Sequence, residues 1–260
     1  MQINLSYLQI KSLIEEAEKI LVYVSRDASA DGVLAGLTLH TYLAGLGKKP
    51  ALVYPAEIPS EIKDLSGVQA IEKSLGAKNL VISFDYTKTE VEKVNYKVDK
   101  GKFNLILQSK KPIAPSELSF SYTGRDFDLI IFLGVTDLEK LNESFEGEDF
   151  YLSKPSLNID NKVTNSFFAK VNLVDPKASS ISEILATLFE KFGRPLAKKE
   201  AELLVLGLKY ATNNFTIATS SATFRAASYL TKILEKDKGV ESMQESIEVS
   251  KEQISKENFA

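Results

Sequence analysis

The sequence predicts an α/β protein in which a mainly parallel β-sheet is flanked by helices, with an antiparallel hairpin insertion and a helical C-terminal part. In the first part of the chain, short apolar, β-branched runs alternate with segments of helical spacing. The stretch 79–124 departs from this and alternates apolar with polar residues, which is typical of antiparallel strands. From residue 179 to residue 236 helical patterns dominate.

The first elements predict a β–α–β unit. Residues 7–20 carry apolar side chains at helical spacing, with Ser6 as the expected N-cap. The run ILVYVS at 20–25 predicts a buried strand. A helix is expected over 31–46, ending before Gly47, and a second strand over 50–54. This order implies parallel pairing with a right-handed crossover.

The stretch 79–124 is predicted to be an antiparallel hairpin inserted into the sheet. Its strands flank Asp99-Lys100-Gly101-Lys102, a sequence that favours a tight turn. Exposed strands of such an insertion can pair with a partner chain, or they can be covered by the protein itself. The sequence leaves both alternatives open.

The remaining elements complete one predicted domain over residues 1–236. Strands are expected at 128–134, 156–160 and 168–174, and helices at 179–192, 197–212 and 220–236. Residues 237–260 form a polar helix or tail in this interpretation. The serines at 179, 180 and 182, followed by Glu183, predict a helix cap, although such a helix start also suits an anion.

The composition limits the chemistry that is available. A net charge of −3 argues against a mainly electrostatic nucleic-acid binder, while a local basic groove stays compatible with it. The absence of cysteine excludes disulfides, zinc–thiolate sites and thiol catalysis. No apolar run approaches the ~20 residues of a membrane span. The N-terminus lacks the features of a signal peptide, so a cytoplasmic location is expected. The single histidine, His40, lies in a predicted helix and is expected to serve packing or the surface.

One segment carries a specific resemblance. Residues 158–185 read NIDNKVTNSFFAKVNLVDPKASSISEIL. This resembles the third motif of the DHH phosphoesterase superfamily, in which Asp-His-His is followed by an Asn-containing loop, a strand, Asp-Pro and a Ser-rich helix start. Asp160 retains the aspartate, while Asn161 and Lys162 stand at the two histidines. The resemblance extends over about residues 15–235 and implies a DHH-type N-terminal domain.

Two further motifs of the superfamily have also lost ligands. In the first motif, Ser25 stands at the histidine and Ser29 at the first aspartate, while Asp31 keeps the second. In the second motif, Gly134 stands where the metal-bridging aspartate is expected. The superfamily includes nanoRNases, phosphoadenosine phosphatases and cyclic-dinucleotide phosphodiesterases, and the resemblance implies that its active members use Mn²⁺ or Mg²⁺.

The fourth motif reads GLKYATNNF at 207–215. Ala211 replaces its aspartate, and Asn213 replaces the glycine that follows. Of the six ligand positions that the resemblance implies (25, 29, 31, 134, 161 and 211), only Asp31 carries a ligand. One carboxylate cannot hold two divalent ions.

These losses predict a protein without catalysis and without a cofactor, kept for binding. The expected partner is a nucleotide, a short oligonucleotide or another protein, with a homodimer also considered and no membrane involved. Candidate contacts at the family-equivalent positions are Ser25, Ser29, Asp31, Gly32, Gly134, Asp160, Asn161, Lys162, Asn165, Ala211 and Asn213.

The alternative is a residual metal-dependent phosphodiesterase or phosphatase that acts on nucleotides or short oligonucleotides. Its ion would be held by an unconventional set of acids: Asp27, Asp31, Asp85, Asp137 and Asp160. The C-terminal substrate-binding domain of the superfamily, with its Gly-Gly-Gly-His loop, is expected to be absent, because no such run follows residue 193.

Overall fold

The computed structural model describes residues 2–75, 79–123, 126–139, 141, 154–193 and 196–236. The chain divides into two compact units, one formed by Met1–Ser74 with Phe127–Ala260 and the other by Leu75–Asp126. The first contains a parallel sheet with helices, and the second contains antiparallel strand pairs. The α/β class with an antiparallel insertion is therefore confirmed.

The sheet of the first unit has six strands in the order β10-β9-β8-β1-β2-β3, and every neighbouring pair is parallel. Burial on both faces explains why the central strands have continuous apolar sequences. Ile130 and Phe132 lie on one face of β8, and Leu129, Ile131 and Leu133 lie on the other, all of them buried. The strands are β1 (Lys19–Val24), β2 (Lys49–Val53), β3 (Ile71–Glu72), β8 (Leu129–Leu133), β9 (Ser156–Asp160) and β10 (Val171–Val174).

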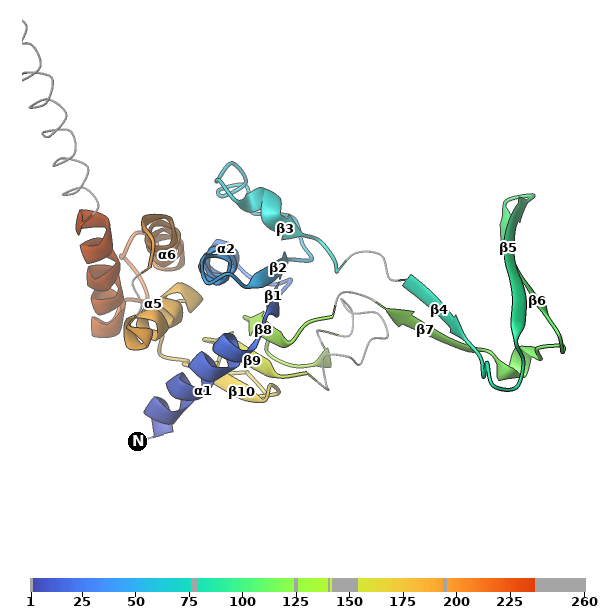
Figure 1. Ribbon diagram of the computed structural model, residues 1–260. Coiled ribbons are helices and arrows are strands. Elements are labelled where there is room, and N and C mark those ends of the chain that lie inside the picture. The colour runs from blue at the N-terminus through green and yellow to red at the C-terminus, as the bar shows by residue number, and fades with distance from the viewer. Residues whose placement is uncertain are drawn as a thin grey trace, which may run out of the picture. The chain divides into compact units, whose positions relative to one another are not determined.

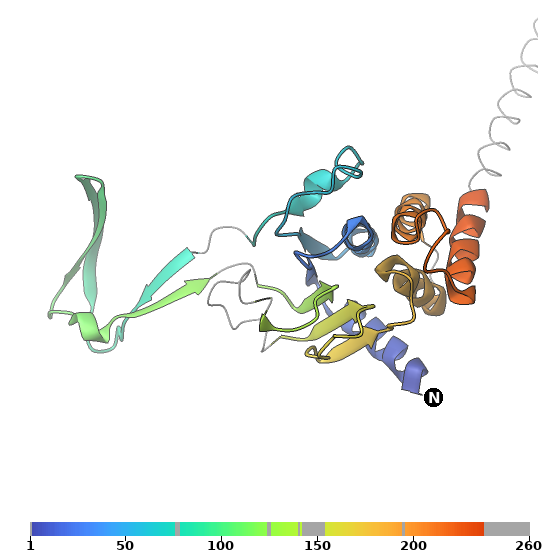
Figure 2. The same cartoon turned by 180° about the vertical axis from the view of Figure 1, so that it is seen from behind.

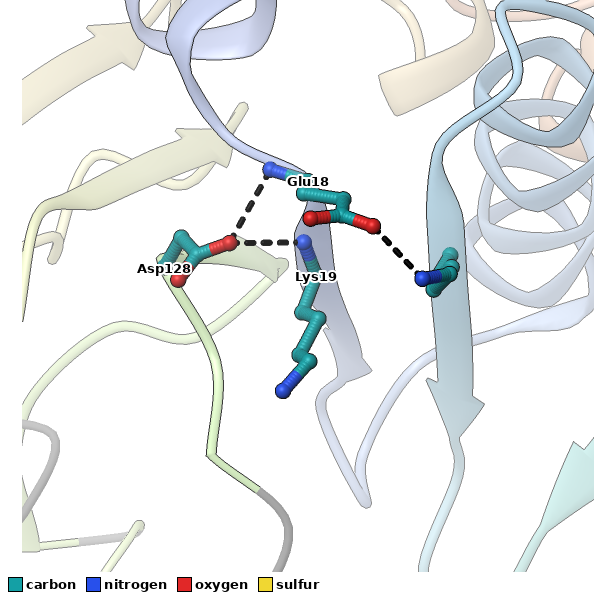
Figure 3. Close-up of polar contacts among 4 residues, drawn as sticks. Glu18, Lys19 and Asp128 are labelled. Carbon is teal, nitrogen blue, oxygen red and sulfur yellow. Dashed lines mark hydrogen bonds and ion pairs between the residues drawn. The ribbon is translucent and has the colours of Figure 1, made fainter.

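Asp128 fixes the start of β8 against the start of β1 (Figure 3). Its carboxylate accepts the backbone N–H groups of Glu18 and Lys19 at 3.0 and 2.8 Å. The hydrogen bond from Lys19 is the main reason why the pKa of Asp128 lies below its usual value. On the other side of β1, the Glu18 carboxylate forms an ion pair with Lys49 at the start of β2. These contacts set the register of three adjacent strands at their amino ends.

Helices pack against this sheet and against one another. Figures 1 and 2 show α2, α5 and α6 side by side beside the sheet, and their apolar side chains share one core with β1, β8 and β9. The Tyr42 and Phe189 rings of α2 and α5 lie 4.5 Å apart between centroids. The helices are α1 (Gln2–Glu16), α2 (Ala30–Gly45), α5 (Ile181–Phe192), α6 (Lys198–Ala211) and a helix over 221–236, with short 3₁₀ turns at Val68–Ala70 and Pro115–Glu117.

The second unit contains two antiparallel pairs, β4 (Asn79–Ser83) with β7 (Ser119–Thr123) and β5 (Val91–Asp99) with β6 (Lys102–Ser109). The predicted turn joins β5 to β6. Lys100 and Gly101 both have positive φ, at 49° and 77°, as a two-residue type I′ turn requires. That backbone conformation matches the twist of the two strands and fixes their register.

Two predicted boundaries are wrong. The first helix begins at Gln2 and ends at Glu16, so Ser6 lies inside it and is not its N-cap. The strand expected over 168–174 is limited to Val171–Val174. The Asn172 side chain donates to the carbonyl groups of Phe167 and Ala169 and accepts from the Ala169 N–H, which closes a turn ahead of the strand.

The polar helix or tail predicted for 237–260 lies outside the described residues. Within the described ranges, every helix is too short or too polar to span a bilayer.

Candidate functional site

The four motif segments meet at one cleft at the carboxyl end of the sheet. Its volume is about 460 Å³. Seven of the predicted positions line it: Ser29, Asp31, Gly32, Gly134, Asn161, Lys162 and Ala211. The other four predicted positions, Ser25, Asp160, Asn165 and Asn213, do not line it.

Asp31, the one retained ligand position, is used by a helix. Its side chain is 4% exposed, and its two oxygens accept the N–H groups of Ile181 and Ser182 at 2.8 and 3.1 Å. Burial raises the pKa of Asp31 to about 6, against the lowering effect of hydrogen bonds from Ser182 and Ile181. The Asp31 carboxylate thus caps the first turn of α5, which lies about 150 residues later in the sequence. Both of its oxygens accept a backbone N–H of that turn.

Further side chains complete the cap of α5. Ser180 accepts the Glu183 N–H at 3.0 Å, while the Glu183 carboxylate accepts the N–H and hydroxyl groups of Ser179 at 3.1 and 2.6 Å. Thr223 also donates to Glu183, at 2.8 Å. The first three N–H groups of α5 are therefore occupied by protein oxygens. The serine-rich start is a helix cap, as one of the two sequence interpretations predicts, and its first three backbone N–H groups are not available to an anion.

Gly134 ends β8 with φ +68°. A Cβ at this position would lie 3.3 Å from the Ile181 side chain and 3.8 Å from Ser25 Cβ. Ser25 is itself buried, and its N–H donates to the Leu133 carbonyl at 2.9 Å. The backbone at this expected ligand position therefore favours glycine, and any larger side chain would meet the first turn of α5.

A buried polar network holds the loop that follows β9. Asp160 accepts the Asn161 N–H at 2.8 Å and the Asn165 side-chain amide at 2.7 Å. Asn165 also donates to the Val135 carbonyl and accepts from Asn158 at 3.2 Å. Asp160 and Asn165 therefore hold the loop through buried hydrogen bonds, and neither lines the cleft.

Asn161 and Lys162 lie at the cleft surface, at the end of β9. Asn161 donates to the Ala178 carbonyl at 3.2 Å, which fixes the side chain against the start of α5. Lys162 is half-buried, and within the described residues its ammonium group has no hydrogen-bond or ion-pair partner. Among the described residues, the cleft therefore contains a cation without an ion-pair partner.

The start of α2 forms the opposite wall. Ser29 occupies the N-cap position, but its side chain makes no capping hydrogen bond. The N–H groups of the first turn, including those of Ala30 and Gly32, therefore have no side-chain cap, in contrast to those of α5. Such an open helix start carries a partial positive charge and favours anions.

Tyr210 and Glu61 are among the cleft residues that were not predicted. Tyr210 lies near the end of α6, and its hydroxyl donates to the Glu61 carbonyl at 3.2 Å. The two residues are 149 positions apart. Tyr210 lies within the fourth motif segment but was not a predicted contact, and Glu61 belongs to none of the motif segments. Their contact depends on the tertiary packing of α6 near residues 54–67, which no local pattern reveals.

After α6 the backbone of the fourth motif segment turns through residues in the left-handed region. Asn213 and Asn214 have φ values of 45° and 54°, in the left-handed region. Asparagine enters this region more readily than most residues, so the change from glycine to Asn213 does not remove the turn. Thr212 supports it by accepting the Phe215 N–H at 2.9 Å.

The donor set does not fit a pair of manganese ions. Asp31 has both oxygens engaged with α5, and serine, glycine, asparagine and alanine stand at the other ligand positions. In the described part of the chain, no group of three His, Cys, Asp or Glu side chains is placed to hold an ion. Of the alternative acids, Asp85 belongs to the second unit, where it bonds Thr87.

Comparison with known proteins gives a partial match in sequence and a broad one in fold. No protein-family model matches the chain. Over 59 residues the chain is 44% identical to the cyclic-di-AMP phosphodiesterase PdeA of Listeria monocytogenes serotype 1/2a (strain 10403S). This aligned segment covers 22% of this chain and 9% of PdeA. The exopolyphosphatase-related protein from Bacteroides fragilis superposes with a TM-score of 0.62 at 16% identity.

That superposition covers 88% of this chain and 56% of the other, so the chain spans little more than half of the structural relative. The exonuclease RecJ bound to manganese gives a TM-score of 0.40 at 14% identity, over 87% of this chain and 46% of RecJ.

Proposed function

We propose that this chain, which has the fold of the DHH phosphoesterase superfamily, is a non-catalytic domain that binds the phosphate of a nucleotide or short oligonucleotide in the cleft. One observation carries the proposal. The only carboxylate kept at a metal-ligand position is bonded through both oxygens to the first turn of α5. These two hydrogen bonds use part of the acceptor capacity of the carboxylate and hold it toward α5, so Asp31 is less available to a metal ion.

The donors that stay available suit an anion. Lys162 supplies an unneutralised ammonium group on one side of the cleft, and the uncapped start of α2 supplies N–H groups on the other. The Ser29 hydroxyl adds a neutral donor beside the α2 start. A phosphate group between these elements would receive charge-assisted hydrogen bonds without a metal ion.

The acidic side chains at the cleft favour a ligand that carries little charge beyond its phosphate. Asp27 and Glu61 are exposed at the rim, opposite in charge to Lys162. They repel additional phosphates and can accept hydrogen bonds from the amino groups of a base or from a ribose hydroxyl. A nucleoside monophosphate or the end of a short oligonucleotide fits this arrangement better than a polyphosphate.

Replacing Lys162 with alanine is expected to weaken nucleotide binding by roughly ten- to a hundredfold, because one charge-assisted contact contributes about 1.5–3 kcal/mol. Titration calorimetry with AMP and with a two-nucleotide RNA measures the effect, in the presence of EDTA. Lys232→Ala serves as the matched control, since Lys232 is an exposed lysine of the 221–236 helix outside the cleft. Binding by the control is expected to equal that of the unchanged protein.

Two results would contradict the proposal. The first is an equal affinity in Lys162→Ala and Lys232→Ala, which would remove the cleft from the interaction. The second is hydrolysis of the same ligands that requires Mn²⁺ and stops in EDTA, which would establish a phosphoesterase and favour the alternative function.

A further inference from the structure

The β5–β6 ribbon of the second unit has one face on which three successive cross-strand pairs are apolar. The cross-strand pairs on this face are Val94–Leu107, Tyr96–Leu105 and Val98–Phe103. Five of these six side chains are 45% to 72% exposed, and Leu107 is half-buried. A two-stranded ribbon is only marginally stable in water by itself. We therefore expect this apolar face to be extended or covered by an additional protein segment.

The two edges of the ribbon differ in charge. Strand β5 carries four charged residues: Glu92, Lys93, Lys97 and Asp99. In β6 the only charged residue is Lys102, at its first position, and the following seven residues are uncharged. Charged side chains on an edge strand discourage pairing with further strands, so β5 is protected and β6 is not. In the described ranges, β6 pairs with β5 alone.

We propose that β6 pairs with β6 of a second copy of this chain, antiparallel and about a two-fold axis at Leu105. The product is a four-stranded sheet in the order β5-β6-β6-β5 with a continuous apolar face. In self-pairing about a two-fold axis, the same strand segment of both copies forms the contact, and residue i lies opposite residue j while j lies opposite i. A strand with charges along its length would meet like charges, whereas the uncharged run from Phe103 to Ser109 does not.

Two requirements determine the position of the axis: the apolar side chains must lie on one face, and like charges must not lie opposite each other. Successive side chains of a strand point to opposite faces. The apolar side chains of both copies therefore lie on the same face only if the two-fold axis passes through a residue; an axis between two residues would place them on opposite faces. An axis at Leu105 sets Phe103 opposite Leu107 and Lys102 opposite Gln108. An axis at Ile106 would set Lys102 opposite Lys110, and an axis at Asn104 would shorten the pairing because the turn begins at Lys100.

Single cysteines test this geometry directly, because the full chain contains none. Side chains directly opposite each other on neighbouring antiparallel strands have Cβ atoms about 5 Å apart, so Leu105→Cys is expected to form an intermolecular disulfide under mild oxidation. Tyr96→Cys is the matched control on the same apolar face. Its two copies would be separated by three strand spacings, about 14 Å, which is too far for a disulfide. Non-reducing electrophoresis measures the yield of the covalent dimer.

Sedimentation of the unmodified chain and of two lysine variants provides an independent readout. We expect a dimer, and a dissociation constant raised roughly tenfold or more in Leu105→Lys, with a smaller change in Tyr96→Lys. A monomer at all concentrations would overturn the proposal. Equal cross-linking of the two cysteine variants, or equal effects of the two lysine variants, would also overturn it, since each result places the contact away from the β6 edge.

Discussion

Replacing Gly207 with alanine is expected to lower the free energy of unfolding by about 3 kcal/mol, the largest effect predicted for a single methyl group in this protein. Gly207 lies in α6, where it faces the start of α5. An added Cβ would overlap the Ser182 hydroxyl and lie 2.9 Å from a carboxylate oxygen of Asp31. Both neighbours are buried, so the helices must separate or the bonds from α5 to Asp31 must break. Urea denaturation at pH 7 measures the loss.

Gly45→Ala is the matched control for this prediction. Gly45 is also a helical glycine, but no atom lies within 4 Å of a Cβ built on it. Alanine favours helix over glycine by about 1 kcal/mol, so this variant is expected to be neutral or slightly more stable. Similar stability changes in Gly207→Ala and Gly45→Ala would show that α5 and α6 do not pack as closely as described.

Asp31→Asn is expected to change the pH dependence of stability. The pKa of Asp31 is raised from its ordinary value to about 6 in the folded protein, so the folded state binds the proton more tightly than the unfolded state. The resulting stabilisation is fully present below about pH 4 and is lost as the pH rises through about 6. The stability difference between the unchanged protein and Asp31→Asn is therefore expected to be larger at pH 4 than at pH 7.5, by about 2 kcal/mol.

Asp128→Asn gives a control of opposite sign. The pKa of Asp128 is lowered by the hydrogen bond from the Lys19 N–H, so its stabilisation is present at neutral pH and is lost as the pH falls. Denaturation with urea at pH 4 and 7.5 compares the two variants. A difference for Asp31→Asn that stays constant, or that grows with pH, would contradict the burial of its carboxylate.

The sequence was sufficient to predict those strands and turns that depend on the residues of their own segment. Continuous apolar runs predicted β1 and β8 because both faces of these strands are buried, and the Lys100-Gly101 turn predicted the β5–β6 ribbon because its backbone demands are specific. The start of α1 was placed too late because Ser6 has the chemistry of a cap but lies within the helix. A capping side chain shows where a helix can begin, not that it does begin there.

Seven of the eleven predicted site positions line the cleft, but the contacts of Asp31 with α5 were not predicted. The four motif segments meet at the cleft as expected, yet the bonds from Ile181 and Ser182 to Asp31 join residues 150 and 151 positions apart. No periodicity or spacing reveals such a contact, because it depends on how α5 packs against α2. The same reason hid the contact between Tyr210 and Glu61.

The capping of α5 by Asp31 also determines how a metal centre could be rebuilt in this scaffold. Histidines at positions 25, 161 and 162 would supply new nitrogen donors, but the carboxylate between them would stay engaged with the helix. Adding metal ligands one residue at a time would therefore leave the Asp31 carboxylate in its role as a helix cap. An engineer would first have to give α5 a substitute cap of its own, which frees the aspartate, and only then add the imidazoles.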